Sequence, residues 1–352
     1  MNTARNTAGE MVGLRYCNDN EPGLRRRRAG KGFRYLDENG RLISNVRTLD
    51  RIKSLAIPPA WTDVWIAPRS DGHIQATGRD AKGRKQYRYH PQWTACRDEV
   101  KYSNLVAFAR TLPDLRKRIE ADMGLRGLPR ERVLASVVWL LDHALIRVGN
   151  AAYARENGSF GLTTLRDRHV DVRGSRLRFV FRGKSGKEWK LTITDRRIAR
   201  IVKGAQDLPG QHLFQYLDES GQRHSIGSEN VNAYIRERSG GDFSSKHFRT
   251  WAGTVEAANL LKDTDRPETR HETARALNHV IDKVAASLGN TRSICRKCYI
   301  HPAVLDAWDD GRLSSELESL GSRRTPKRYS SEEFAVLRWL EKRQRRSRGS
   351  SA

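Results

Sequence analysis

The sequence predicts an α+β protein with a small β-rich N-terminal domain and a larger, mainly helical domain that carries a β-hairpin. Up to about residue 90, short alternating apolar and polar runs are separated by turn residues. Beyond that point apolar residues recur at three- and four-residue steps, which is the helical period, and alternation returns only near residue 180. A length of 352 residues with 37% hydrophobic content is enough for two domains with their own cores.

The chain is strongly basic, with 66 Lys and Arg against 41 Asp and Glu and a formal charge of +25. Such a balance indicates a polyanionic partner, and nucleic acid is the first candidate. Ribosomal and histone-like proteins share this charge, but they are usually shorter and poorer in Trp, of which this chain has 8. Charge alone does not separate an enzyme from a coat protein.

Residues 1–13 lack an apolar signal region, and no run of 18 apolar residues occurs, so we expect a cytoplasmic protein that neither enters nor crosses a membrane. Four cysteines in a chain of this length do not form a disulfide framework, and we expect free thiols at Cys17, Cys96, Cys295 and Cys298. Cys295 and Cys298 lack the second ligand pair that a structural zinc site needs, so no metal site is predicted.

Composition divides the chain into four segments: a basic N-terminal arm (1–30), a β-rich domain (31–97), a helical domain (98–325), and a C-terminal helix with a basic tail (326–352). The arm ends in the run Arg25–Arg28, which we expect to be solvated or to lie against phosphate. In the second segment, residues 33–36 and 41–43 predict a hairpin around Asp37–Gly40. A short helix and three further strands are expected at 48–55, 64–66, 74–77 and 86–89.

The segment 77–89 combines cations with two tyrosines and an amide. On a strand, Tyr87 and Tyr89 share one face, and Gln86 lies on the other. Tyrosine hydroxyls suit phosphate contacts, as do nearby Arg79 and Arg84, and glutamine can pair with a base edge. The competing interpretation is an exposed hairpin with amphipathic tyrosines.

In the helical domain, residues 131–148 place apolar side chains along one stripe, with Gly149 as the expected C-cap. Arg147 would then project from the last turn of a rigid helix. Alternating runs at 177–181 and 189–193 predict a hairpin with Lys184 at its tip.

Ser245 is the expected N-cap of a helix that buries Phe248, Trp251, Ala252 and Val255. Lys246 and Arg249 should share the opposite side of that helix. Further helices are expected at 272–288, where Gly289 ends the pattern, and at 332–345.

The segment 289–302 presents one tyrosine, Tyr299, among the cations Arg292, Arg296 and Lys297. A phenol has a pKa near ~10, so attack at neutral pH requires neighbouring cations. The alternative is a half-buried aromatic residue in a basic nucleic-acid-binding segment. Tyr299 therefore needs partners from elsewhere in the chain.

An arginine at the end of a buried helix, a lysine on a hairpin tip, a Lys-x-x-Arg and then a tyrosine together resemble the active site of type IB DNA topoisomerases. Tyrosine recombinases share that arrangement. The small poxvirus and bacterial topoisomerases are the closer resemblance, carried by residues 77–89, 146–150, Tyr153, 156–157 and 161–165. The resemblance extends over about residues 13 to 305.

The resemblance implies that Tyr299 is the nucleophile and that Arg147, Lys184 and Arg249 are catalytic cations. Asn290 occupies a position that is histidine in the poxvirus enzymes, and its amide can still donate to a phosphate oxygen. The DNA-contacting residues implied by the resemblance or expected from their charge are Gln86, Tyr87, Tyr89, Tyr153, Arg79, Arg84, Lys246 and Asn150. At the position of Asn150 the poxvirus form has lysine, so sequence preference is expected to differ.

The implied activity is relaxation of positive and negative supercoils through a 3′-phosphotyrosyl intermediate, strand swivelling and religation, without a cofactor. Residues 31–97 would bind DNA and 98–325 would carry catalysis, in a monomer that clamps double-stranded DNA at the nucleoid. A tyrosine recombinase is the first alternative, although most recombinases have histidine where this chain has Lys246 and a helical first domain. A non-catalytic basic DNA-binding protein is the second.

Overall fold

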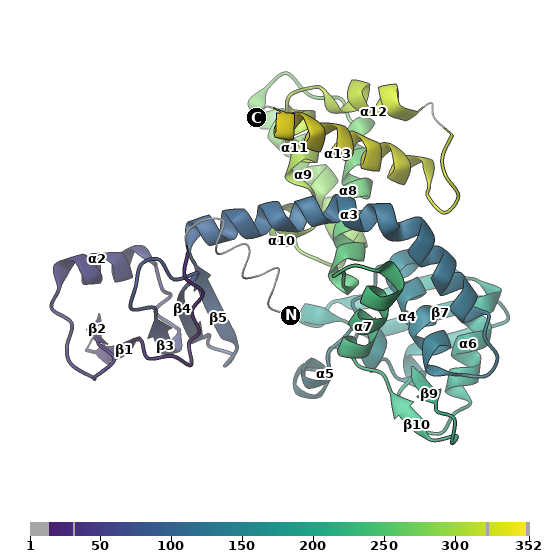
Figure 1. Cartoon of the computed structure of the whole chain (residues 1–352), viewed down its shortest axis with the longest axis horizontal. Coiled ribbons are helices and arrows are strands. Elements are labelled where there is room, and N and C mark those ends of the chain that lie inside the picture. The colour runs from purple at the N-terminus through teal and green to yellow at the C-terminus, as the bar shows by residue number, and fades with distance from the viewer. Residues whose placement is uncertain (1–13, 31, 322–323, 350–352) are drawn as a thin grey trace. The chain divides into compact units, whose positions relative to one another are not determined.

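The computed structural model describes residues 14–30, 32–321 and 324–349. The chain forms two compact units, residues 1–104 and 105–352 (Figure 1). No helix in the described ranges is long and apolar enough to cross a membrane.

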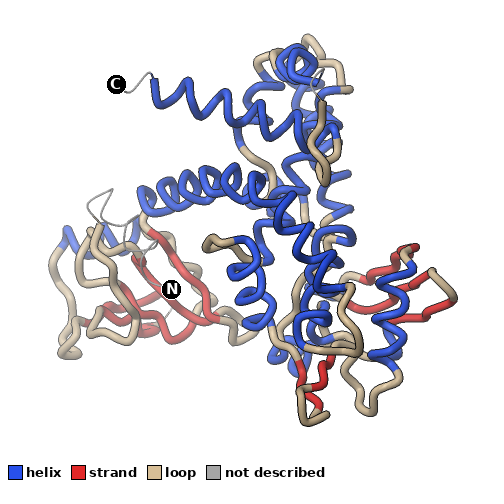
Figure 2. The backbone as a smooth tube through the Cα atoms, turned by 45° about the vertical axis from the view of Figure 1, so that its right-hand side comes forward, coloured by secondary structure: helices blue, strands red, loops and turns tan. Residues whose placement is uncertain are grey.

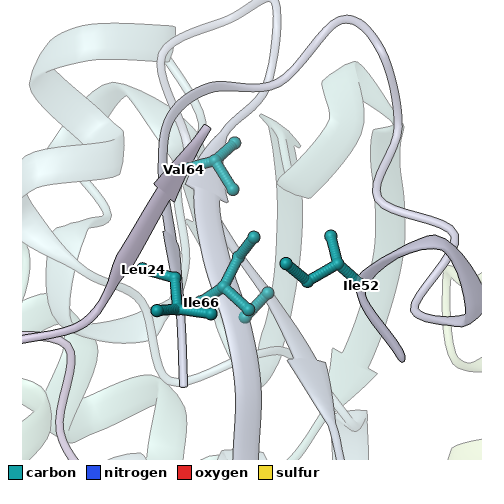
Figure 3. Close-up of a cluster of buried hydrophobic side chains, with 5 residues drawn as sticks. Leu24, Ile52, Val64 and Ile66 are labelled. Atoms are coloured by element: carbon teal, nitrogen blue, oxygen red, sulfur yellow. The ribbon is translucent and has the colours of Figure 1, made fainter. Parts of the chain in front are cut away.

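The first unit is built on a five-stranded antiparallel sheet with the order β2-β1-β3-β4-β5 (Figure 2, red). Helix α2 (Val46–Ser54) begins at Asn45, whose side chain accepts a hydrogen bond from the Thr48 amide. Ile52 of this helix packs with apolar side chains of the sheet to form a core (Figure 3). The strands are β1 (Leu24–Ala29), β2 (Gly32–Leu36), β3 (Thr62–Ile66), β4 (Ile74–Arg79) and β5 (Lys85–Tyr89).

The predicted basic arm is wrong for its last residues, because Leu24–Ala29 is strand β1, bonded to β2 and β3. The rest of the arm includes residues 1–13, which lie outside the described ranges. Four successive arginines hid the alternation of this strand from a hydrophobicity pattern. Arg26 donates to the carbonyls of Ile57, Pro58 and Trp61, whereas Arg27 is exposed.

The predicted hairpin at 33–43 is likewise only partly correct. Strand β2 has β1 as its main partner, and the segment after the turn forms one isolated bridge, between Leu36 and Leu42. The other strands and α2 lie where the sequence predicts them, with ends shifted by one to two residues.

The second unit is mainly helical and contains two small antiparallel sheets. Helices α4 and α8 pack against each other, and α8 also contacts α7, α9, α11, α12 and α13. The helices are α4 (Arg130–Ala144), α5 (Ala151–Asn157), α6 (Arg196–Gln206), α7 (Ser228–Ser239), α8 (Ser245–Lys262), α9 (Arg270–Ser287), α10 (Arg292–Cys298), α11 (Pro302–Asp309), α12 (Leu313–Gly321) and α13 (Ser331–Gly349), and α3 (Pro91–Met123) begins in the first unit. The strands are β6 (Val170–Arg173), β7 (Arg176–Arg182), β8 (Glu188–Thr194), β9 (Gln215–Leu217) and β10 (Arg223–Ser225).

Helix α13, predicted as a separate C-terminal segment, is tied into this unit by a partly buried ion-pair network. The Arg116 guanidinium contacts carboxylates of Asp142 at 2.7 Å and Glu333 at 2.8 Å. The indole of Trp251 on α8 also donates to Glu333, at 2.9 Å. The helix therefore belongs to the packed fold around α8.

Candidate active site

Arg147 lies in the loop just after α4, and the prediction that it occupies the last helical turn is wrong. The helix stops because Leu145 adopts a left-handed conformation with φ 54°, so Gly149 is not its cap. The segment is held in place by the Leu162 amide, which donates to the Arg147 carbonyl at 2.9 Å. Gly161 permits this approach, since a Cβ there would lie 2.6 Å from that carbonyl oxygen.

Arg249 lies in α8 and is only 4% exposed, so the expected polar face shared with Lys246 is not observed. Its guanidinium donates to the carbonyls of Leu145 and Leu288, at the ends of α4 and α9. Carbonyls at helix C-termini lack intrahelical partners, which makes them acceptors for a buried cation. Lys246 is exposed, and the N-cap is Ser244 rather than the predicted Ser245.

Asn290 and Gly289 bind Arg147 at the end of α9. Arg147 Nη2 donates to the Gly289 carbonyl at 3.0 Å and to the side-chain oxygen of Asn290. Gly289 has φ 57°, a left-handed conformation that glycine adopts without strain, and it turns the chain so that Asn290 faces Arg147. Asn290 is 9% exposed.

The cluster contains buried donors that lack a hydrogen-bond partner. Three of the five such side-chain atoms in the described ranges are Arg147 Nη1, Arg249 Nε and Asn290 Nδ2. Buried donors are normally paired, and an unsatisfied one costs about 1–3 kcal/mol. Three of them in one cluster indicate a site for an external acceptor.

Electrostatics favour an anionic acceptor. Burial lowers the pKa of Arg147, and burial together with the charge of Arg147 lowers the pKa of Arg249 to about 10. Each charged guanidinium therefore lacks a full counter-charge in the free protein. A phosphodiester would supply both the negative charge and the acceptor oxygens.

Tyr299 lies next to this cluster. It caps α10, a short helix that the sequence analysis did not predict, and the Arg249 guanidinium carbon lies 5.3 Å from its ring centroid. Its amide donates to the Cys295 carbonyl at 2.9 Å. Gly253 of α8 allows close packing, because a Cβ at that position would lie 2.8 Å from the Tyr299 carbonyl oxygen.

Lys184 occupies the tip of the β7–β8 hairpin, as the sequence predicts, and it is exposed. The turn bends sharply through Ser185 (φ 63°) and Gly186 (φ 74°). The hairpin contacts the arginine cluster through a second lysine, because Lys187 Nζ donates to the Asn290 carbonyl at 2.5 Å.

Residues 90–318 match the protein family described as eukaryotic DNA topoisomerase I, catalytic core, and residues 32–80 match bacterial DNA topoisomerase IB, N-terminal domain. The DNA topoisomerase 1B of Acanthamoeba polyphaga mimivirus is 31% identical over 297 residues, which is 82% of this chain and 88% of the relative. The DNA topoisomerase 1B of Vaccinia virus (strain Copenhagen) is 21% identical over 236 residues, 66% of this chain and 72% of the relative. The chain belongs to the type IB DNA topoisomerase family.

As a type IB topoisomerase, the protein is an isomerase that acts on DNA, and the tyrosine recombinase interpretation is not favoured. Enzymes of this family require neither ATP nor a metal ion. The predicted α+β architecture, with a β-rich first domain and a larger helical one, is confirmed.

Four of the predicted DNA contacts of this topoisomerase lie on or beside strand β5 in the first unit. Tyr87 and Tyr89 share a face as predicted, and their rings stack at 5.8 Å. Asp80 accepts hydrogen bonds from the Arg84 guanidinium at 2.8 Å and the Gln86 amide at 2.9 Å. The hydrogen bond from Arg84 is the main reason that the pKa of Asp80 is lowered to about 2. These side chains are therefore held in place before any ligand binds.

The other predicted contacts differ in how they are held. Arg79 pairs with Asp63 at 3.6 Å, so it is not a free cation. In the second unit, Asn150 is the N-cap of α5, where its side-chain oxygen accepts from the amides of Ala152 and Tyr153. Tyr153 itself is 48% exposed. Lys187 and Gly253 were missed by sequence reasoning, because neither residue type signals a role without its three-dimensional neighbours.

Proposed function

We propose that Tyr299, Arg147, Arg249, Asn290 and Lys184 form the active site with which this topoisomerase cuts and rejoins one DNA strand. The observation that carries the proposal is the set of three unpaired buried donors beside the tyrosine. The Tyr299 oxygen attacks a backbone phosphorus and forms a P–O bond while the P–O bond to the next nucleotide's 5′ oxygen breaks. The product is a 3′-phosphotyrosyl bond and a free 5′-hydroxyl.

The two arginines and Asn290 bind the nonbridging oxygens, on which negative charge increases in the transition state. Donors that are already oriented for that charge each contribute about 10² to 10³ in rate. Arg249 also lies against the tyrosine, so its charge lies close to the attacking oxygen and the phosphate. Arg147 donates a hydrogen bond to the side-chain oxygen of Asn290, and this bond fixes the direction of the Asn290 amide nitrogen, which is itself a donor.

Lys184 protonates the leaving 5′ oxygen. Its ammonium group is on an exposed turn, as a residue that meets DNA needs to be. General-acid catalysis of this kind contributes about 10² to 10⁴ in rate. In the reverse step the 5′-hydroxyl attacks the phosphorus of the phosphotyrosyl bond, the tyrosine oxygen leaves and the strand is resealed. Between cleavage and religation the cut duplex swivels, which releases torsional strain of either sign.

We further infer that the enzyme works as a monomer that closes around the duplex, in the cytoplasm of a bacterium at the nucleoid. The bacterial N-terminal family match, the charge of +25 and the division into two units support this proposal. Light scattering of the DNA complex would test the monomer, since two protein chains per short duplex would contradict it. Imaging a fluorescent fusion against a DNA stain would test the location.

The central test is covalent trapping on end-labelled duplexes followed by denaturing electrophoresis. The parent should form an adduct at a 3′ phosphate, and Tyr299→Phe should bind DNA equally but form none and relax no circles of either sign. Relaxation by Tyr299→Phe above a hundredth of the parental rate, or an adduct at a 5′ phosphate, would refute the proposal.

A further inference from the structure

The hairpin tip that carries Lys184 is attached to the arginine cluster by two neighbouring contacts. Lys187 Nζ donates to the Asn290 carbonyl at 2.5 Å. Beside it, the Trp189 ring packs on Gly289, where an added Cβ would lie only 2.7 Å from a ring carbon. Both contacts fall on the two residues that also accept hydrogen bonds from Arg147.

Lys184 and Lys187 belong to one compact turn. The Gly183 amide donates to the Lys187 carbonyl at 2.7 Å, and the Gly186 amide donates to the Gly183 carbonyl at 3.1 Å. A turn closed by these bonds moves as a unit, so the position of Lys187 determines the position of Lys184. The Lys184 ammonium itself makes no hydrogen bond or ion pair within the described ranges, and thus nothing else holds it.

Lys187 is exposed at the surface, with its ammonium hydrogen-bonded to the backbone carbonyl of Asn290. Its ammonium lies against Asn290, whose side chain binds Arg147, and Arg147 already lowers the pKa of Arg249. This hydrogen bond therefore places a third cation at the edge of the arginine cluster.

We propose that Lys187 is a positioning residue, which holds the hairpin tip on Asn290 so that Lys184 can reach the leaving oxygen. This inference rests on the proposed role of Lys184 as general acid. Lys187 is not required to touch the DNA. Its removal should impair proton donation and leave phosphate binding by Arg147, Arg249 and Asn290 intact.

A substrate with sulfur at the 5′ bridging position separates these effects. A thiolate leaves without a proton, so a variant that is slow only because proton donation fails should recover on this substrate. A variant with a damaged phosphate site should remain slow on both substrates. Single-turnover cleavage would be measured on matched oxygen and sulfur duplexes, with thermal unfolding and DNA affinity recorded for each protein.

The informative variant is Lys187→Met, which keeps the aliphatic stem and removes the ammonium. We expect it to cleave the oxygen substrate about ten- to a hundredfold more slowly than the parent, because small misplacements of reacting groups have effects of this size. It should cleave the sulfur substrate at close to the parental rate. Lys187→Arg should recover part of the loss, and Lys184→Ala combined with Lys187→Met should be no slower than Lys184→Ala alone.

Lys190→Ala is the matched control, because this exposed lysine on the same hairpin pairs with Glu188 at 2.9 Å. It should cleave both substrates like the parent. Parental cleavage by Lys187→Met, or equal slowing on both substrates, would overturn the inference. If Lys187→Met cleaves slowly while Lys184→Ala cleaves at the parental rate, Lys187 is the general acid itself, and the positioning role is overturned. The acid role of Lys184 is tested separately by Lys184→Ala. If that role is wrong, this variant will cleave the sulfur substrate as slowly, relative to the parent, as it cleaves the oxygen substrate.

Discussion

Arg147 and Asn290 form a side-chain pair in which the guanidinium donates to the amide oxygen. A guanidinium can only donate, so the oxygen of Asn290 must face Arg147 and its Nδ2 must point the other way. That nitrogen is one of the buried donors without a partner. The pair therefore turns a neutral side chain into an oriented donor within the arginine cluster.

Substitutions of Asn290 should separate its donor from its acceptor. Asn290→Ala should slow cleavage less than Arg147→Ala or Arg249→Ala, because a neutral donor contributes less than a charged one. Asn290→Asp keeps the acceptor for Arg147 but places a negative charge where phosphate binds, so it should cleave more slowly than Asn290→Ala. Single-turnover cleavage at saturating enzyme gives this ranking, and an aspartate variant faster than the alanine variant would contradict it.

Gly289 should tolerate no side chain, for two separable reasons. Its φ of 57° is strained for alanine, and an added Cβ would lie 2.7 Å from Trp189. Gly240 has a similar φ of 70° with no atom within 4 Å, so Gly240→Ala measures the conformational cost alone. We expect about 1 kcal/mol lost for Gly240→Ala and more for Gly289→Ala, which should also slow cleavage. Urea unfolding checks this, and equal losses would exclude the steric contribution.

The lowered pKa of Arg249 predicts a pH-dependent contribution to DNA affinity. In the free enzyme this pKa is about 10, and a bound phosphate should raise it because the negative charge favours the charged guanidinium. The contribution is thus complete only well below pH 10 and is lost as the pH rises through that value.

The measurement compares Tyr299→Phe with Tyr299→Phe/Arg249→Gln between pH 8 and 10.5. Because the Tyr299 phenol raises the pKa of Arg249, its removal lowers that pKa further, and the ratio of the two affinities should fall by at least about fourfold at pH 10.5. Lysines titrate alike in both proteins, so their effect cancels in this ratio. Tyr299→Phe removes the phenol from both proteins. A ratio that is constant with pH would show that Arg249 stays fully charged in the free enzyme.

Neighbouring arginines in β1 should differ in their effect on stability. Arg26 donates to three carbonyls and lies 4.1 Å from the Phe33 ring centroid, whereas Arg27 is exposed. Arg26→Ala should therefore lower the free energy of unfolding of the first unit by about 2 kcal/mol. Arg27→Ala should change it by less than about 0.5 kcal/mol. Equal effects in urea unfolding would contradict the alternation of this strand.

Asn150 should combine a capping role with base contact. Asn150→Asp keeps the acceptor for the amides of Ala152 and Tyr153 but removes the amide donors. If those donors contact DNA, this variant should fold like the parent and cleave a changed set of sites. Mapping cleavage on a long duplex tests this, and an unchanged set of sites would restrict Asn150 to capping.

Much of this protein is determined by local sequence. The alternating runs that became β3, β4, β5, β7 and β8, and the helical stripes of α8, α9 and α13, depend on which face of each element is buried. The same periodicity placed Lys184 at a hairpin tip, and the spacing of motifs singled out Tyr299. These features could be predicted because period and turn chemistry act within a few residues.

Only the tertiary structure decided how the charged groups are partnered. Four successive arginines carry no hydrophobic period, so the strand formed by Leu24–Ala29 appears only when its neighbours in the sheet are present. Arg249 is buried on a helix face that its sequence position suggested was polar, because helix ends from two distant segments supply the carbonyls that it binds. The contact between Lys187 and Asn290 joins residues 103 positions apart. Such pairings follow from where packed elements end in space, which no local pattern encodes.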